Sequence, residues 1–241
     1  MIAAIFAALL AAAAPDALEK SCAAGKGAAC DALGARVRDG IGVPRNEQRA
    51  AELFRKACKA KDADGCADDA RALALGEGQG ADPHAALPRL TKLCNAGRPR
   101  ACGHLGEMFL RGLGGPQDSA RAEDLLERAC TKGDAHACST VFHVAFKQGD
   151  RERARDFADK ACELNDAAGC AFIGDLYATT SDTVRAIMYF RRACDSGFPH
   201  GCAGQGYLLI EAGDPQEGRA LVQKGCDGGD DKACEFLQNL K

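Results

Sequence analysis

The sequence predicts an all-α protein built as a solenoid of two-helix repeats, and three observations support this fold class. The fourteen cysteines fall into seven pairs with one spacing, C-x7-C, and none is left over. The first members of successive pairs lie 36 residues apart three times and then 32 residues apart three times. Aromatic residues make up only 5% of the chain and tryptophan is absent, which leaves little bulk for one deep globular core. A fixed period of this length is the signature of stacked helical repeats.

The N-terminal segment predicts export. Residues 2–14 are uninterrupted apolar residues, a length that suits the hydrophobic region of a signal peptide and is too short to span a bilayer. Ala11, Ala12 and Ala13 supply an A-x-A cleavage pattern, although no Lys or Arg precedes the apolar run. The alternative is a hydrophobic first helix that stays in place. We assign residues 1–14 to a signal peptide and residues 15–241 to the repeat array.

The array contains about six and a half units, each starting near the second cysteine of a pair. The unit starts are Cys30, Cys66, Cys102, Cys138, Cys170 and Cys202, with a short terminal cap from Cys234.

Each first cysteine is predicted to end a helix. The residue eight positions before it is always Ala or Gly, the residue four before is apolar, and the residue two before is Lys or Arg. This spacing marks one helical face with a positive charge near the C-terminal end. These helical segments are residues 50–58, 86–94, 122–130, 154–162, 186–194 and 218–226. Three residues after the cysteine stands glycine in five pairs, Asn165 in one and Lys61 in one, which predicts a left-handed C-cap.

Each second cysteine is predicted to begin the next helix. Apolar residues follow it at helical spacing, such as Leu105 and Phe109 after Cys102. A small residue often lies four positions after it, where we expect neighbouring helices to touch backbone to backbone. These small residues are Gly34, Ala70, Gly106, Gly174 and Gly206.

The connections explain the change of period. Glycine-rich turns of the 36-residue units occupy residues 40–44, 76–80 and 112–116. The 32-residue units shorten this connection to residues 149–150, 179–182 and 213–215. Gly76, Gly78 and Gly80 have the spacing of a phosphate loop, but they follow a helix rather than a strand, so we interpret them as a turn.

The cysteines are the site residues that the sequence identifies, and we expect seven disulfides. The expected pairs are Cys22–Cys30, Cys58–Cys66, Cys94–Cys102, Cys130–Cys138, Cys162–Cys170, Cys194–Cys202 and Cys226–Cys234. The alternative is metal, but structural zinc sites use closer C-x2-4-C pairs, and no histidine completes a tetrahedron here. A redox-active C-x-x-C is also absent from the sequence. Stable disulfides require an oxidising compartment, so we expect a periplasmic or secreted protein.

A family resemblance follows from these residues. The pattern K-A-C-x-x-G-x4-C-x-x-L-G, followed by D-G-x-G-V, resembles Sel1-like repeats, and residues 94–106 and 22–43 show it best. With paired cysteines throughout, the chain resembles the secreted cysteine-rich Sel1-repeat proteins of the Hcp beta-lactamase family. The resemblance implies a right-handed α/α solenoid related to tetratricopeptide repeats.

The resemblance also implies beta-lactamase or penicillin-binding activity, but the residues contain no catalytic motif. No serine has a lysine three residues later, as S-x-x-K requires, and K-T-G is missing. The five histidines are dispersed, although His136 and His143 could share a helix face. Asp62-x-Asp64-Gly65 hints at calcium but lacks the later ligands of an EF-hand. We therefore expect no catalytic residue, no cofactor and no metal site.

Charge and repeat architecture together predict the function. The net charge is −3 and no basic patch is visible, so we expect no nucleic-acid partner. We expect an exported monomeric scaffold that binds a protein, a peptide or a cell-envelope component in a concave groove, lined by the first helix of each unit. We expect no membrane insertion after signal cleavage. The alternative function is a weak beta-lactam hydrolase.

Overall fold

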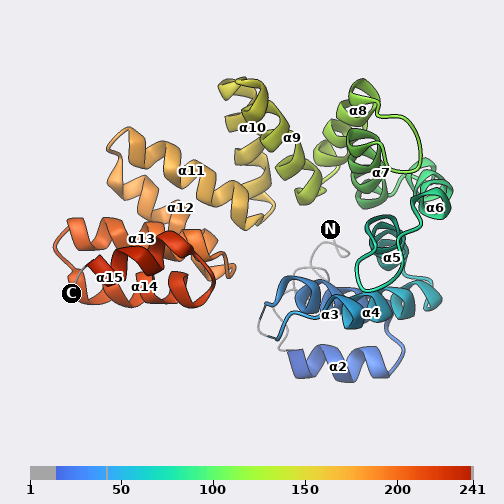
Figure 1. The fold of residues 1–241 in the computed structure, drawn as a ribbon, viewed down its shortest axis with the longest axis horizontal. Coiled ribbons are helices and arrows are strands. Elements are labelled where there is room, and N and C mark those ends of the chain that lie inside the picture. The colour runs from blue at the N-terminus through green and yellow to red at the C-terminus, as the bar shows by residue number, and fades with distance from the viewer. Residues whose placement is uncertain (1–14, 42, 240–241) are drawn as a thin grey trace. The chain divides into compact units, whose positions relative to one another are not determined.

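The computed structural model describes residues 15–41 and 43–239, and the predicted signal peptide lies outside these residues (Figure 1). Within these ranges the regular secondary structure is helical throughout, without a strand. We call the helices that contain a second cysteine A helices. They are α3 (Gly27–Asp39), α5 (Ala63–Leu75), α7 (Pro99–Arg111), α9 (Ala135–Gln148), α11 (Ala167–Thr179), α13 (Pro199–Glu211) and α15 (Asp231–Asn239).

The helices that contain a first cysteine are the B helices. They are α2 (Pro15–Ala23), α4 (Glu47–Lys59), α6 (Pro83–Asn95), α8 (Ser119–Thr131), α10 (Arg151–Glu163), α12 (Thr183–Asp195) and α14 (Pro215–Asp227). None of these described helices combines the length and the apolar character that a membrane span requires. The all-α repeat fold predicted from the cysteine spacing is confirmed.

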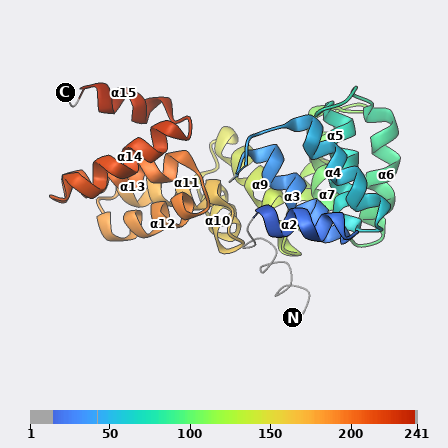
Figure 2. The same cartoon turned by 90° about the horizontal axis from the view of Figure 1, so that it is seen from below.

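The chain divides into two compact units, Met1–Ala129 and Cys130–Lys241. Within each unit an A helix packs against the B helix that follows it, and that B helix packs against the next A helix (Figure 2). A helices of neighbouring repeats also contact each other directly, α3 with α5 and α5 with α7 in the first unit, α9 with α11 and α11 with α13 in the second. The exposed sides of these A helices therefore form a continuous surface in each unit, which we call the A-helix face.

Aspartate and asparagine side chains start most of the helices. Every B helix from α4 to α14 has an Asn or Asp N-cap twelve residues before its first cysteine, whose side chain accepts a backbone N–H three residues later. These caps are Asn46, Asp82, Asp118, Asp150, Asp182 and Asp214. Four A helices have the same cap four residues before the second cysteine, namely Asp62, Asp134, Asp166 and Asp230. The A helices therefore begin about one turn earlier than the cysteine-based prediction, because the cap satisfies backbone N–H groups of that first turn.

The left-handed residues predicted after each first cysteine are confirmed. All seven have positive φ, from 63° at Lys61 and Asn165 to 99° at Gly229. The next backbone N–H turns back to a carbonyl near the end of the B helix, as when the Asp62 N–H donates to the Ala57 carbonyl at 3.1 Å. The chain can therefore reverse direction and start the next A helix immediately.

The small residues on the A helices do lie at helix contacts, but most contacts differ from the expected backbone approach. A Cβ on Gly34 or Gly174 would lie 2.7 Å from the ring of Phe54 or Phe190 in the following B helix. Only Gly206 meets mainly backbone, at the Gly218 carbonyl 2.5 Å from the added Cβ. An absent side chain on the A helix thus makes room for a large one on the B helix.

The glycine-rich turns of the longer units have a packing role. Gly78 has φ 65°, and a Cβ there would lie 2.4 Å from the backbone of Glu47 and Gln48, at the start of α4. Gly114 has φ 77° and approaches Pro83 at the start of α6 in the same way. Each turn therefore packs on the B helix of the preceding repeat, which confirms that the Gly76–Gly80 motif is a turn.

Candidate functional site

The structure joins the predicted cysteine residues as seven disulfides, each between the two members of one C-x7-C pair. The Cα–Cα distances are between 4.3 and 4.7 Å. Each bridge links the last turn of a B helix to the first turn of the next A helix, and no cysteine is left free. The bridges lie at separate bends, so their role is to hold the bend and not to form a common site.

The second unit contains a groove on its A-helix face, which we call the aromatic groove. Its volume is about 460 Å³, within the ~300–1,000 Å³ range of ligand pockets. It is lined by Phe142, His143 and Phe146 from α9, Ala168, Ala171, Phe172, Asp175, Leu176 and Thr179 from α11, and Phe198 and His200 at the start of α13. Three successive A helices therefore contribute to one surface.

Three of the phenylalanine rings that line the aromatic groove form one cluster. The Phe172 ring lies 5.1 Å from the Phe142 ring and 5.4 Å from the Phe146 ring, the latter edge to face. Phe142 is 4% exposed and anchors the cluster, whereas Phe146 is 55% exposed. An apolar ring held by neighbouring rings and open to solvent is suited to pack against an apolar side chain of a partner.

An exchange of residue sizes places Phe142 in the groove. It occupies the position four after the second cysteine, where the other five complete repeats have Gly or Ala. The facing position in α10, four before the first cysteine, is Ala158, where the other repeats have Phe, Leu or Val. Phe142, Ala158 and Ile173 pack in one buried cluster. The large side chain comes from the A helix in this repeat, and its buried ring supports the ring of Phe172 from 5.1 Å away.

Charged groups lie at the α13 end of the groove. His200 Nε2 lies 3.1 and 3.2 Å from the two carboxylate oxygens of Asp175, and Nδ1 lies 3.4 Å from Asp230 Oδ2. The hydrogen bond with Asp175 raises the pKa of His200 above its ordinary value, and Asp230 adds to this effect while burial opposes it. His143 Nδ1 donates to the Ser139 carbonyl at 2.7 Å, since a carbonyl can only accept.

The A helices of the first unit meet at a buried polar cluster instead. Asp31 from α3, Asp68 from α5, and Arg100 and His104 from α7 form what we call the carboxylate cluster. Arg100 Nη1 donates to Asp31 at 2.8 Å and to Asp68 at 3.0 Å, and His104 Nε2 lies 2.8 Å from Asp68. The cluster therefore connects three A helices through side chains that are paired with one another.

The two carboxyl groups of this cluster have opposite pKa shifts. Burial, followed by the neighbouring Asp68 carboxylate, raises the pKa of Asp31 to about 8, against the opposing charge of Arg100. Burial would also raise the pKa of Asp68, but the hydrogen bond with His104 and the charge of Arg100 outweigh it and lower that pKa. The proton of the pair therefore resides on Asp31 at neutral pH.

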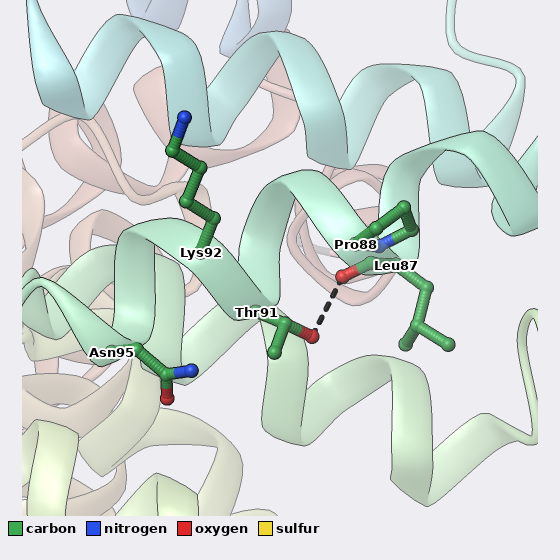
Figure 3. A pocket seen from close by; sticks show the side chains of 5 residues that line it. All are labelled: Leu87, Pro88, Thr91, Lys92 and Asn95. Carbon is green, nitrogen blue, oxygen red and sulfur yellow. Dashed lines mark hydrogen bonds between the residues drawn. The ribbon is translucent and has the colours of Figure 1, made fainter.

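A second hollow lies beside α6 (Figure 3). Leu87, Thr91 and Asn95 line it four residues apart on one helix face, with Pro88 and Lys92 beside them. The Thr91 hydroxyl donates to the Leu87 carbonyl at 2.8 Å. All five lining residues belong to one helix, so the hollow offers a partner a single wall. The aromatic groove, with walls from three helices, is the stronger candidate.

Of the other residues that the sequence singled out, Asp62 has a structural role and His143 lines the aromatic groove. Asp62 is the N-cap of α5, and its side chain accepts the Gly65 N–H at 2.8 Å, which accounts for the calcium-like pattern. Asp182 caps α12 directly after Ser181. His136 and His143 are both exposed on α9. The sequence predicted a groove along the first helix of each unit but not the aromatic residues that line this one, although the exchanged sizes at Phe142 and Ala158 are visible in the aligned repeats.

The comparisons with known proteins agree with this architecture. The Sel1 repeat family matches residues 27–62, 99–134, 146–166 and 167–198. A Sel1 repeat protein from Oxalobacter formigenes is 21% identical with a TM-score of 0.68, over 93% of this chain and 68% of that one. An immunity protein from Pseudomonas aeruginosa is also 21% identical, with a TM-score of 0.52, over 71% of this chain and 67% of that one.

A protective antigen of uropathogenic Escherichia coli strains, which displays the same repeat fold, is 21% identical with a TM-score of 0.60. The match covers 91% of this chain but only 50% of the antigen, so the chain spans about half of that protein. No curated protein matches the sequence significantly. Because the family matches cover more than half of the 241 residues, the chain belongs to the Sel1 repeat family.

Proposed function

We propose that this protein is an exported scaffold that binds a segment of another protein in the aromatic groove. The observation that carries the proposal is the cluster of Phe142, Phe146 and Phe172, whose most exposed ring lies in a groove with walls from three helices. A Sel1-repeat scaffold suits a protein-interaction role, because stacked helix pairs offer an extended surface.

The cellular location is part of the proposal. Seven disulfides require a non-reducing compartment. Together with the apolar residues 2–14, this requirement supports the periplasm or the exterior of the cell. Bridged bends stabilise the fold by restricting the unfolded chain, which benefits a thin, alanine-rich array.

The experiment selects ligands from random sequences, so that it does not depend on the identity of the natural partner. A phage-displayed library of random peptides is panned on the oxidised protein, and the affinity of recovered peptides is measured by fluorescence anisotropy. We expect Phe146→Ser to weaken binding about tenfold or more, as for a central interface residue. Val184→Ser, which removes an 81% exposed apolar residue from α12 outside the groove, is the matched control and should leave affinity unchanged.

Two results would contradict the proposal. One is recovery of peptides that bind Phe146→Ser as tightly as the wild-type protein. The other is failure to recover any peptide from a library that yields binders to a control tetratricopeptide domain. Circular dichroism of both serine variants verifies that they remain folded, which we expect because both side chains are exposed.

A further inference from the structure

The polar groups around the aromatic groove are mainly hydrogen-bond acceptors. The side chain of Asp175, which lines the groove, is 51% exposed. Because His143 uses Nδ1–H on the Ser139 carbonyl, its Nε2 is an acceptor in the neutral ring. No Lys or Arg is found among the described residues that line the groove. The phenylalanine faces also attract cations through their ring quadrupole.

The charged groups at the α13 end of the groove carry a net negative charge, which also favours a cationic partner. His200 lies between Asp175 and Asp230 and can neutralise only one of the two carboxylates. These three side chains together carry one negative charge when His200 is protonated and two when it is neutral. A cationic partner is therefore attracted at either protonation state of His200, whereas an acidic partner is repelled.

The spacing of the groove residues indicates how such a partner is arranged. Phe172 and Asp175 are three residues apart on α11, so their Cβ atoms are ~5–6 Å apart. In an extended peptide, side chains two residues apart lie on the same side at ~6.6 Å. If an apolar side chain of the peptide packs on the phenylalanine cluster, the side chain two residues further along the peptide therefore lies beside Asp175.

We propose that the aromatic groove binds a polypeptide segment in which an apolar residue and a Lys or Arg are separated by one residue. The apolar side chain packs on Phe146 and Phe172, and the basic group pairs with Asp175. This inference rests on the proposed function and specifies the chemistry of its partner.

The test uses three capped octapeptides that differ at one position. Each has Phe in the fourth position and Lys, Gln or Glu in the sixth, with Gly and Ser elsewhere. Binding to the full oxidised protein is measured by ¹⁵N NMR titration, which is suited to weak complexes. We expect affinity in the order Lys, Gln, Glu. Asp175→Asn should reduce the preference for Lys over Glu about three- to fivefold, the range for a partly exposed ion pair.

The matched control is Asp156→Asn, which removes an exposed carboxylate of α10 whose partner is Arg155. It should leave the preference unchanged, while added salt should reduce the preference in the wild-type protein. If the three peptides bind equally and all depend on Phe146, this inference is overturned and the proposed function stands. If no peptide binds and Phe146→Ser abolishes a concentration-dependent self-association, the occupant is a second copy and the inference is also overturned.

Discussion

Each bend contains one residue in the left-handed conformation, three positions after the first cysteine of its pair. The residue types at these positions differ in how well they tolerate a positive φ. Glycine occupies five of the seven equivalent positions, whereas Asn165 and Lys61 each have φ 63°. A side chain with a Cβ costs ~1–2 kcal/mol in this conformation, and asparagine reduces that cost through local hydrogen bonds. Lys61 is therefore the least favourable residue of the set.

Replacing Lys61 should stabilise the protein. We expect Lys61→Gly to raise the free energy of unfolding by about 1 kcal/mol, because glycine adopts positive φ without a steric penalty. Asn165→Gly should give a smaller gain, and Lys56→Gly, inside α4, should lose about 1 kcal/mol. Urea unfolding midpoints provide the comparison. Equal effects of Lys61→Gly and Lys56→Gly would show that backbone conformation at position 61 is not the cause.

Asp31 shows how burial alters a single carboxyl group. Its Oδ1 atom is buried without a hydrogen-bond partner in the described residues. Its pKa is raised to about 8, above the ordinary 3.8. Between these values the folded state holds a proton that the unfolded state has released, so stability falls as pH rises from about 4 to about 8. The lowered pKa of Asp68 acts in the opposite sense and only at pH values below its ordinary one.

The pH dependence can be isolated with one substitution. Asp31→Asn keeps the shape but cannot ionise, so we expect the fall in stability between pH 4.5 and 8 to become shallower than in the wild-type protein. Unfolding midpoints in urea across this range measure the slope. Asp16→Asn, at an exposed position in α2, is the control. Parallel curves for wild-type protein and Asp31→Asn would refute the assignment of the proton to Asp31.

At the scale of the element, the space between an A helix and the following B helix has room for one large side chain at the position four after the second cysteine. Gly34 faces Phe54 and Gly174 faces Phe190, so the B helix fills the space in those repeats. In the α9–α10 pair Phe142 fills it from the other side, over Ala158. The fold therefore accommodates the large side chain on either the A helix or the B helix of a repeat.

A double-mutant cycle tests this exchange of volume. Phe142→Ala should cost about 3–5 kcal/mol as a core truncation, and Ala158→Phe about 1–3 kcal/mol through overpacking. The double variant should lose at least about 1 kcal/mol less stability than the two single variants lose together, because the ring added at position 158 fills the cavity left at position 142. Chemical unfolding of the four proteins gives the coupling energy. Strict additivity would mean that the two positions do not share one space.

At the scale of the whole molecule, a disulfide bridges each bend, while the core between the helices contains mostly small side chains. Within each unit the buried residues are largely alanine and cysteine, with few large side chains such as Phe54 and Phe190. Disulfides supply stability that such a core supplies only in part. The A helices of the two units, Met1–Ala129 and Cys130–Lys241, carry different groups: a buried carboxylate cluster in the first unit and the aromatic groove in the second.

The disulfides make a direct chemical prediction. Protein folded without reductant should show no reactive thiol after unfolding, and peptide mapping should find only pairs eight residues apart. Cys94→Ala combined with Cys102→Ala should lower the free energy of unfolding by about 2.5 kcal/mol. This is the entropic contribution of closing a loop of about nine residues in the unfolded chain. Free thiols in the folded protein, or bridges between different pairs, would disprove the pairing.

The repeat, the helices and the bends can be predicted from the order of the amino acids, because they depend on local signals. The spacing within a cysteine pair, the C-cap glycines and the helical period of apolar residues each relate residues no more than eight positions apart. The Asn and Asp caps are equally local, but they lie about one turn before the second cysteine and three turns before the first, so an alignment on cysteine places them outside the predicted helices.

The side chains that meet across repeats could not be predicted in this way. Asp31, Asp68 and Arg100 are separated by more than thirty residues from one another, and Phe142, Phe172 and His200 come from three different helices. Their proximity depends on how successive A helices pack, and the spacing within one repeat contains no information on that packing. The proposed partner-binding surface is therefore a property of the stack, since its lining residues come from three successive repeats.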